Sequence, residues 1–110
     1  MTILVTGGAG FIGSNFLHHL ISTTTEQIIC IDKLTYASDW HNIPDPIKFY
    51  TTDIVDEHNC EYVFKKYKPT TVFHFAAESH VDNSIHDCSP FILANINGTV
   101  NLLNLSLKYE

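Results

Sequence analysis

The sequence contains no arginine, and its six lysines are outnumbered by twelve aspartate and glutamate residues, which gives a formal net charge of −6. An acidic chain without a basic stripe does not favour binding to nucleic acid or to an anionic membrane surface. No apolar run approaches the length of a membrane span, and the first residues lack the order of a secretory signal. We therefore expect a cytoplasmic protein that binds neither nucleic acid nor membrane.

The chain is also poor in the residues that build metal sites and disulfides. Its three cysteines, Cys30, Cys60 and Cys88, are odd in number and widely spaced, so we expect reduced and mostly buried thiols. Its seven histidines show no metal-ligand spacing, so no metal site is expected. His74 lies within an apolar run, where a core histidine is more common than a ligand, and both interpretations stay open.

Strand and helix patterns alternate along the 110 residues, which predicts one domain, residues 1–110, of the α/β class. We expect strands at 2–6, 27–31, 47–51 and 70–75, and helices at 10–22, 56–68 and 90–108. Right-handed crossovers between these strands predict a Rossmann-type doubly wound parallel sheet, in part, with strand order 3-2-1-4. The loops at 7–13 and 76–84 then open onto one crevice, where ligands bind in such folds.

The helices carry their own signals. In the first, Ile12, Phe16 and Leu20 share a face and are expected to be buried. Asp56 is the expected N-cap of the second, and Ser89, before Pro90, is the expected cap of the third. The second helix is expected to bury four side chains, Cys60, Val63, Phe64 and Tyr67.

Three glycines, Gly7, Gly10 and Gly13, follow the first strand and lead into the first helix. Glycines at this spacing permit a tight turn, a close approach of a pyrophosphate to the main chain, and close packing of the helix on the strand. The helix N-terminus then offers N–H groups and a partial positive charge to phosphate. The pattern predicts a dinucleotide site.

Acidic and polar residues stand where the expected strands end. Asp32 follows the second strand, where a carboxylate accepts from both ribose hydroxyls and repels a 2′-phosphate, so NAD is expected rather than NADP; a solvated loop aspartate is the alternative. Asp53 follows the third strand, where it contacts an adenine amino group or forms a turn. Asn95 and Thr99 share a face of the last helix that points at the site or at solvent.

Three segments resemble known proteins. The run GGAGFIGSN at 7–15 is similar to the extended short-chain dehydrogenase/reductase superfamily. The runs DKLTYA at 32–37 and AAESHVD at 76–82 resemble the dTDP-glucose 4,6-dehydratases within it. The resemblance covers essentially the whole chain. It implies a reaction in which NAD⁺ takes hydride from C4 of the sugar, water leaves across C5 and C6, and the hydride returns to C6, so that dTDP-glucose becomes dTDP-4-keto-6-deoxyglucose.

The resemblance also implies roles for single residues. Ser79 is expected near the nucleotide-sugar substrate as well as the cofactor. The expected cofactor contacts are Gly7, Gly10, Phe11 and Ile12 at the pyrophosphate with Gly13 in the same motif, Asp32, Lys33, Leu34 and Thr35 around the adenosine ribose, Asp53 and Ile54 at the adenine, and Phe75, Ala76, Ala77, Glu78 and Ser79 along the nicotinamide half.

The chain departs from the family's usual pattern at Asn83, where arginine is usual, and at Ala94, where threonine is usual. The resemblance implies a Thr-Asp-Glu run and a Tyr-x-x-x-Lys pair at positions that are expected beyond Glu110. Tyr62 and Lys66 have the latter spacing but lie on the helix before the fourth strand, so no residue of the chain is expected to be catalytic.

We interpret the chain as the NAD-binding portion of a dTDP-glucose 4,6-dehydratase. Three alternatives stay open: a truncated, inactive dinucleotide-binding module, another NAD-dependent nucleotide-sugar epimerase or dehydratase, and an interaction protein that pairs through its last helix. The resemblance also implies a homodimer, with the last helix near the interface.

Overall fold

A four-stranded parallel sheet forms the centre of the chain in the computed structural model, which describes residues 1–34, 39–77 and 87–110, with Trp40 described by its backbone alone. The strands are β1 (Thr2–Thr6), β2 (Gln27–Asp32), β3 (Lys48–Thr51) and β4 (Thr71–His74), in the order β3-β2-β1-β4. All three pairings are parallel, and Thr6 at the end of β1 lies opposite Ile31 and His74. The predicted strand order is confirmed.

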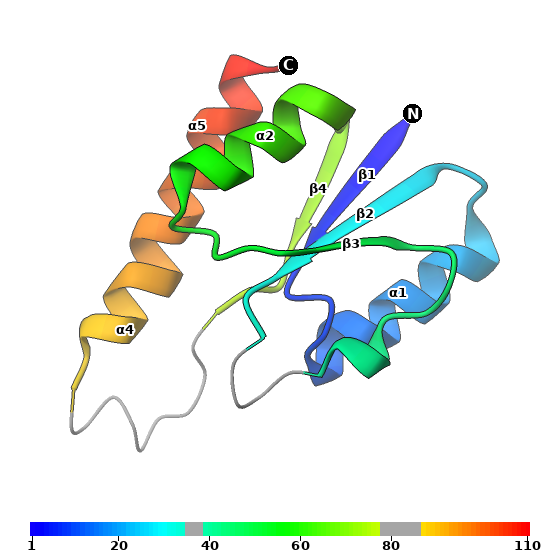
Figure 1. Ribbon diagram of the computed structural model, residues 1–110, viewed down its shortest axis with the longest axis horizontal. Coiled ribbons are helices and arrows are strands. Elements are labelled where there is room, and N and C mark those ends of the chain that lie inside the picture. The colour runs from blue at the N-terminus through cyan, green and yellow to red at the C-terminus, as the bar shows by residue number, and fades with distance from the viewer. Residues whose placement is uncertain (35–38, 78–86) are drawn as a thin grey trace.

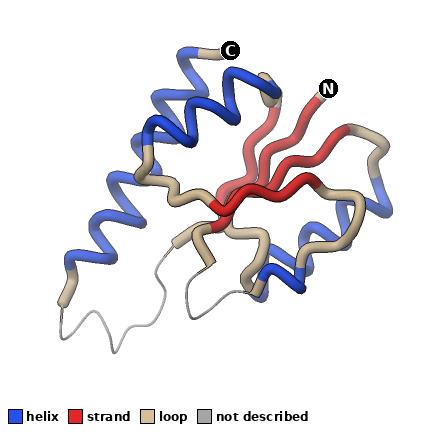
Figure 2. The backbone as a smooth tube through the Cα atoms, in the orientation of Figure 1, coloured by secondary structure: helices blue, strands red, loops and turns tan. Residues whose placement is uncertain are grey.

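Helices cover both faces of this sheet (Figures 1 and 2). They are α1 (Phe11–Thr23), α2 (Glu57–Tyr67), α4 (Ser89–Ile92) and α5 (Thr99–Lys108), with a short 3-10 turn η1 (Trp40–Asn42) and a π-helical segment η2 (Leu93–Gly98). α1 packs on one face with Val5 and Cys30, whereas α2 and α5 pack on the other with Leu4 and Ile29. This is the doubly wound arrangement that the alternating pattern predicts.

The buried face of α1 differs from the expected one. Ile12 is 68% exposed, and Phe16 is only partly buried. The buried residues of the helix are Gly13, Ser14, Leu17 and Leu20, so Leu20 is the one member of the expected face that is buried. Gly13 lies so close to the Gly7 carbonyl that a Cβ atom would collide with it, and this contact turns the Gly13 side of the helix toward the sheet.

α2 follows its prediction closely. Its N-cap is Asp56, whose Oδ1 accepts a hydrogen bond from the Asn59 amide at 3.1 Å. Cys60, Val63 and Phe64 are buried, and Tyr67 packs against them. At the other end of this layer, Glu61 Oε1 accepts from Lys108 Nζ and from the Tyr109 hydroxyl, both at 2.6 Å, which ties α2 to the end of α5.

The last helical segment corrects two expectations. It begins at Ser89 after an N-cap at Cys88, so Ser89 is not the cap. The Cys88 side chain makes no capping bond, and the Asp87 carboxylate accepts from the Ser89 amide at 3.0 Å. It is not one regular α-helix either, because residues Leu93–Gly98 form a π-helix. Two contacts accompany this irregularity: Gly98 lies against the Ile54 side chain, and the Thr99 hydroxyl donates to the Asn95 carbonyl at 3.0 Å.

The prediction of reduced and mostly buried thiols is confirmed. All three thiols are free, and Cys30 and Cys60 are buried. Burial raises the pKa of each of these two thiols to about 12, so both stay protonated at neutral pH. Cys88 is exposed because it precedes α4 at the end of the fold away from both cores. Among the described residues, no helix has the length and apolar character needed to cross a bilayer.

Candidate functional site

The loop after β1 lies directly against the chain that leaves β4. Gly7 has a φ of +72°, and a Cβ atom on it would stand 2.5 Å from the Ala76 nitrogen and 2.6 Å from the Phe75 carbonyl carbon. The two loops therefore meet at the point where the winding of the sheet reverses, as the strand order predicts. In doubly wound sheets this point is where ligands bind.

The other two glycines of the motif play different parts. Gly13 is required by packing, because it faces the Gly7 carbonyl. Gly10 has space beside it: the nearest atom to a Cβ there would be the Gly7 oxygen, at 3.5 Å. It is the N-cap of α1, which has no side-chain cap and no acidic residue in its first turn. The N-terminus of α1 is therefore available to an anion, beside the exposed Phe11 and Ile12.

Asp32 is a buried carboxylate at this edge of the sheet, not a solvated loop residue. It is 8% exposed and ends β2. Its Oδ2 accepts from the Ala9 amide at 3.0 Å, and its Oδ1 accepts from the Leu34 amide at 2.8 Å. One side chain thus fixes the glycine loop and the start of the loop after β2, where Leu34 has a φ of 61°.

The residues after β3 divide between the surface and the core. The Asp53 carboxylate pairs with Lys33 Nζ at 3.6 Å and accepts from the Val55 amide at 3.1 Å, so it does form a turn. Ile54 is 4% exposed and packs against Gly98, and its carbonyl accepts from Asn101 Nδ2 at 2.7 Å. The Ile54 side chain is therefore part of the core between β3 and α5, and it cannot itself cover an adenine ring.

The strand β4 delivers two small residues to the crevice. Ala76 lies opposite Gly7, its amide donates to Thr6 Oγ1 at 3.2 Å, and Ala77 beside it is exposed. The Phe75 ring turns away toward α1, where it packs on Phe16 with ring centroids 5.1 Å apart. Three expected site residues, Thr35, Glu78 and Ser79, lie outside the described residues.

Several residues that the sequence patterns did not indicate form hydrogen bonds to the loops of the crevice. Asn42 Nδ2 and the Asp39 amide both donate to the Ala9 carbonyl, at 2.9 and 3.1 Å, so η1 supports the glycine loop. Thr6 places its hydroxyl between the Ala76 amide and the His74 ring. These bonds join segments far apart in the chain, and the only local signal is the position of Thr6 immediately before Gly7.

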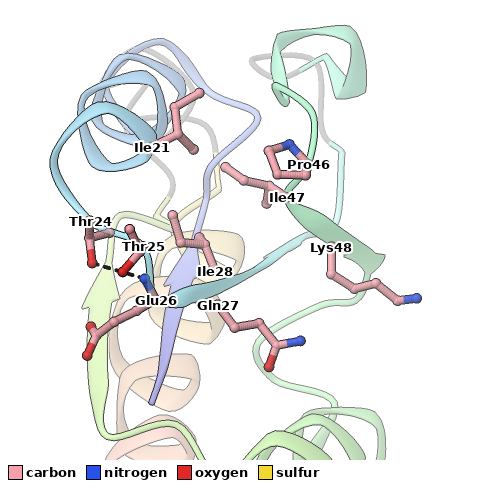
Figure 3. A pocket seen from close by; sticks show the side chains of 9 residues that line it. All are labelled: Ile21, Thr24, Thr25, Glu26, Gln27, Ile28, Pro46, Ile47 and Lys48. Carbon is pink, nitrogen blue, oxygen red and sulfur yellow. Dashed lines mark hydrogen bonds between the residues drawn. The ribbon is translucent and has the colours of Figure 1, made fainter.

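A hollow of about 420 Å³ lies at the opposite end of β2 (Figure 3). Its apolar wall consists of Ile21, Ile28 and Ile47, and its rim includes Gln27 and Lys48, the first residues of β2 and β3. It is therefore remote from the carboxyl ends of the strands. No trio of histidine, cysteine or acidic side chains that could hold a metal ion occurs in the described parts of the chain.

A family model and two sequence relatives that match this chain are all described as nucleotide-sugar 4,6-dehydratases. A family model described as GDP-mannose 4,6 dehydratase matches residues 4–110. The chain is 45% identical over 114 residues to a dTDP-glucose 4,6-dehydratase of Salmonella typhimurium, a match that covers 99% of this chain and 32% of the relative. A dTDP-glucose 4,6-dehydratase of Neisseria meningitidis is also 45% identical, and the match covers 97% of this chain and 32% of that relative. The chain thus spans about a third of the length of these relatives.

Solved structures share the fold. A dTDP-glucose 4,6-dehydratase from Streptomyces venezuelae with NAD and TYD bound superposes with a TM-score of 0.91 at 36% identity, over 99% of this chain and 36% of that one. A UDP-glucose 4-epimerase from Thermus thermophilus in complex with NAD gives a TM-score of 0.93 at 35% identity, over 99% of this chain and 34% of that one. With its strand order and glycine crevice, the chain has the Rossmann-like fold of these enzymes and belongs to the GDP-mannose 4,6 dehydratase family.

Proposed function

We propose that this chain is the NAD-binding part of a dTDP-glucose 4,6-dehydratase. The observation that carries the proposal is the contact of Gly7 with Ala76, which joins the carboxyl-end loops of β1 and β4 into one crevice beside the N-terminus of α1. NAD, when bound, supplies the acceptor and donor of hydride. The chain's own residues bind it, orient it and select it, and none of the described residues is assigned to the chemical steps.

The residues present fit a dinucleotide. The space beside Gly10 and the uncapped N-terminus of α1 admit a pyrophosphate close to the backbone. A carboxylate offers about four acceptor positions, and two backbone amides fix the orientation of the Asp32 carboxylate. In that orientation it would accept from ribose hydroxyls and repel a 2′-phosphate. Ala76 and Ala77 leave room for the nicotinamide half.

The proposal is tested by comparing the binding of NAD and NADP. Asp32→Ala is expected to weaken NAD binding by about 10- to 100-fold, because bonds between a carboxylate and two hydroxyls are lost. Binding of NADP should fall less, because repulsion of the 2′-phosphate is removed while the loss of the bonds to the Ala9 and Leu34 amides affects both dinucleotides. Isothermal titration of both dinucleotides against wild type and variant measures the two changes.

The matched control is Glu26→Ala, which removes a carboxylate beside the opposite end of the same strand. It should leave both dissociation constants unchanged. A wild-type protein that binds neither dinucleotide, or an Asp32→Ala variant that binds NAD as tightly as wild type, contradicts the proposal.

A nucleotide-sugar 4-epimerase is the second candidate, favoured by the structural match to epimerases at TM-scores of 0.93 and 0.94. Among solved structures the identities overlap, at 36% to a dehydratase against 35% and 38% to epimerases. The relatives at 45% sequence identity are dTDP-glucose 4,6-dehydratases, which favours the first candidate. The protein at its natural length distinguishes them. Conversion of dTDP-glucose to a 4-keto product supports the dehydratase, whereas exchange of UDP-glucose and UDP-galactose without a keto product supports the epimerase.

The last helical segment supports a homodimer as part of the same proposal. It exposes a row of apolar side chains at helical spacing, Ile92, Ile96, Val100, Leu103 and Leu107. Leu103→Glu, at a position that is 64% exposed, should leave the fold intact and shift the protein toward a monomer in sedimentation velocity. Asn104→Glu, on the same helix but outside this row, is the control. A wild type that sediments as a monomer at all concentrations contradicts the dimer.

A further inference from the structure

Four hydrogen bonds run without a gap from the crevice to the last helix. The Ala76 amide donates to Thr6 Oγ1 at 3.2 Å, and Thr6 Oγ1 lies 2.6 Å from His74 Nδ1. On the other side of the ring, His74 Nε2 lies 2.9 Å from Thr99 Oγ1. The Thr99 hydroxyl in turn bonds to the Asn95 carbonyl at 3.0 Å.

The two ends of this series determine its direction. A backbone carbonyl only accepts, so the single hydroxyl hydrogen of Thr99 goes to Asn95, and Thr99 Oγ1 accepts from His74 Nε2–H. A backbone amide only donates, so Thr6 Oγ1 accepts from Ala76. Thr6 is fully buried, and among the described residues His74 Nδ1 is the acceptor placed at its hydroxyl, so donation to Nδ1 pairs the hydroxyl hydrogen, whereas a protonated Nδ1 would leave that hydrogen unpaired. The imidazole is therefore neutral, with its proton on Nε2. Desolvation of the ring lowers the pKa of His74, in agreement with this form.

One end of the series lies at the wall of the crevice, and the other lies in the π-helical segment η2. Ala76 forms the wall against which Gly7 packs, within 2.5 Å of where a Cβ would stand. Asn95 lies in the π-helical segment η2, and π turns inside helices are frequent at functional sites. His74 is at the end of β4, opposite Thr6 in the parallel register. Its ring therefore lies between Thr6 and Thr99 and connects the two ends of the series.

We propose that His74 is a positioning residue for the dinucleotide crevice. As a neutral Nε2–H imidazole it orients the Thr6 hydroxyl, which fixes the Ala76 amide opposite Gly7, and it ties this wall to the π turn of the last helix. The effect on ligand affinity rests on the NAD binding proposed above, whereas the bonding pattern and the order of the Ala76 amide do not.

The tautomer is tested directly by nitrogen NMR of the protein with ¹⁵N-labelled histidine. The expected spectrum at neutral pH shows a protonated Nε2 and an unprotonated Nδ1 for His74. A protonated Nδ1, whether in the other tautomer or in an imidazolium, overturns the assignment.

The positioning role is tested by amide exchange at Ala76. His74→Phe removes both ring bonds, and Thr99→Val removes only the distant one, with little change of shape. Each is expected to speed exchange of the Ala76 amide by about fivefold and to weaken NAD binding by a similar factor. Thr71→Val, the same change at an exposed position of β4, should alter neither. Because Thr6 and His74 stand between Thr99 and Ala76 in the series, an effect of Thr99→Val is not expected from local packing alone.

The outcomes separate the two proposals. Wild type that fails to bind NAD ends the proposed function, and the tautomer and exchange results still decide the role of His74. NAD binding with Ala76 exchange unchanged in Thr99→Val and His74→Phe overturns the positioning role alone. If His74→Phe does not fold, the Thr99→Val measurement decides the matter by itself.

Discussion

Replacing Gly7 by alanine is expected to lower the free energy of unfolding by about 2–4 kcal/mol and to abolish NAD binding. An L residue at the observed φ of +72° costs about 1–2 kcal/mol. The new methyl group would also stand 2.5 Å from the Ala76 nitrogen, and backbone cannot move aside as a flexible side chain can. The two carboxyl-end loops must then separate, which opens the crevice.

Urea unfolding measures the first effect, and titration with NAD measures the second. Gly10→Ala is the matched control, because its methyl group meets only the Gly7 oxygen, at an ordinary contact distance of 3.5 Å. Its stability should change by less than about 1 kcal/mol. Its NAD affinity should nevertheless fall, because the space beside Gly10 is the space proposed for the pyrophosphate. Equal stability losses in the two variants would refute the account given for Gly7.

Asn101→Asp is expected to destabilise the fold by about 3 kcal/mol at neutral pH. Asn101 is 8% exposed, and its Nδ2 donates to the Ile54 carbonyl at 2.7 Å. An ionised carboxylate there has no hydrogen to donate, and two acceptors then face each other in a buried site. This bond, with Gly98 on the Ile54 side chain, holds α5 to the chain after β3, so the site after β3 is affected too.

The loss in Asn101→Asp should depend on pH. Only the protonated carboxyl donates to the Ile54 carbonyl, so folding raises the carboxyl pKa above its unfolded value. Stability is then highest below the unfolded pKa and falls as the pH rises through the folded-state pKa. Urea unfolding at about pH 4 and about pH 7 tests this sign, with each value taken relative to wild type. Asn104→Asp on the exposed side of α5 should show no such difference.

The sheet and the crevice could be predicted because each depends on a short, local pattern. Apolar runs marked the strands to within a residue or two, and right-handed crossovers then ordered them as observed. The contact of Gly7 with Ala76 followed from that order, because the carboxyl ends of neighbouring parallel strands must meet. Asp32 was located by its place at the end of β2.

The errors lie where tertiary contacts override local pattern. Ile12 fits a helical period but is exposed, because Gly13 sets the rotation of α1 on the glycine loop. The π turn at Leu93–Gly98 leaves no mark on hydrophobic spacing. The bonds of His74 to Thr6 and Thr99 span 68 and 25 residues of sequence, and no periodicity indicates them.

The two amides that Asp32 holds have an evolutionary consequence. The carboxylate that would select NAD is the same one that anchors the glycine loop through Ala9 and the following loop through Leu34. A descendant that exchanged Asp32 for a smaller residue to admit NADP would lose both anchors in the same mutational step. A change of cofactor in this lineage therefore requires a permissive substitution first, one that restores an acceptor to the Ala9 amide, and the order of the two mutations is constrained.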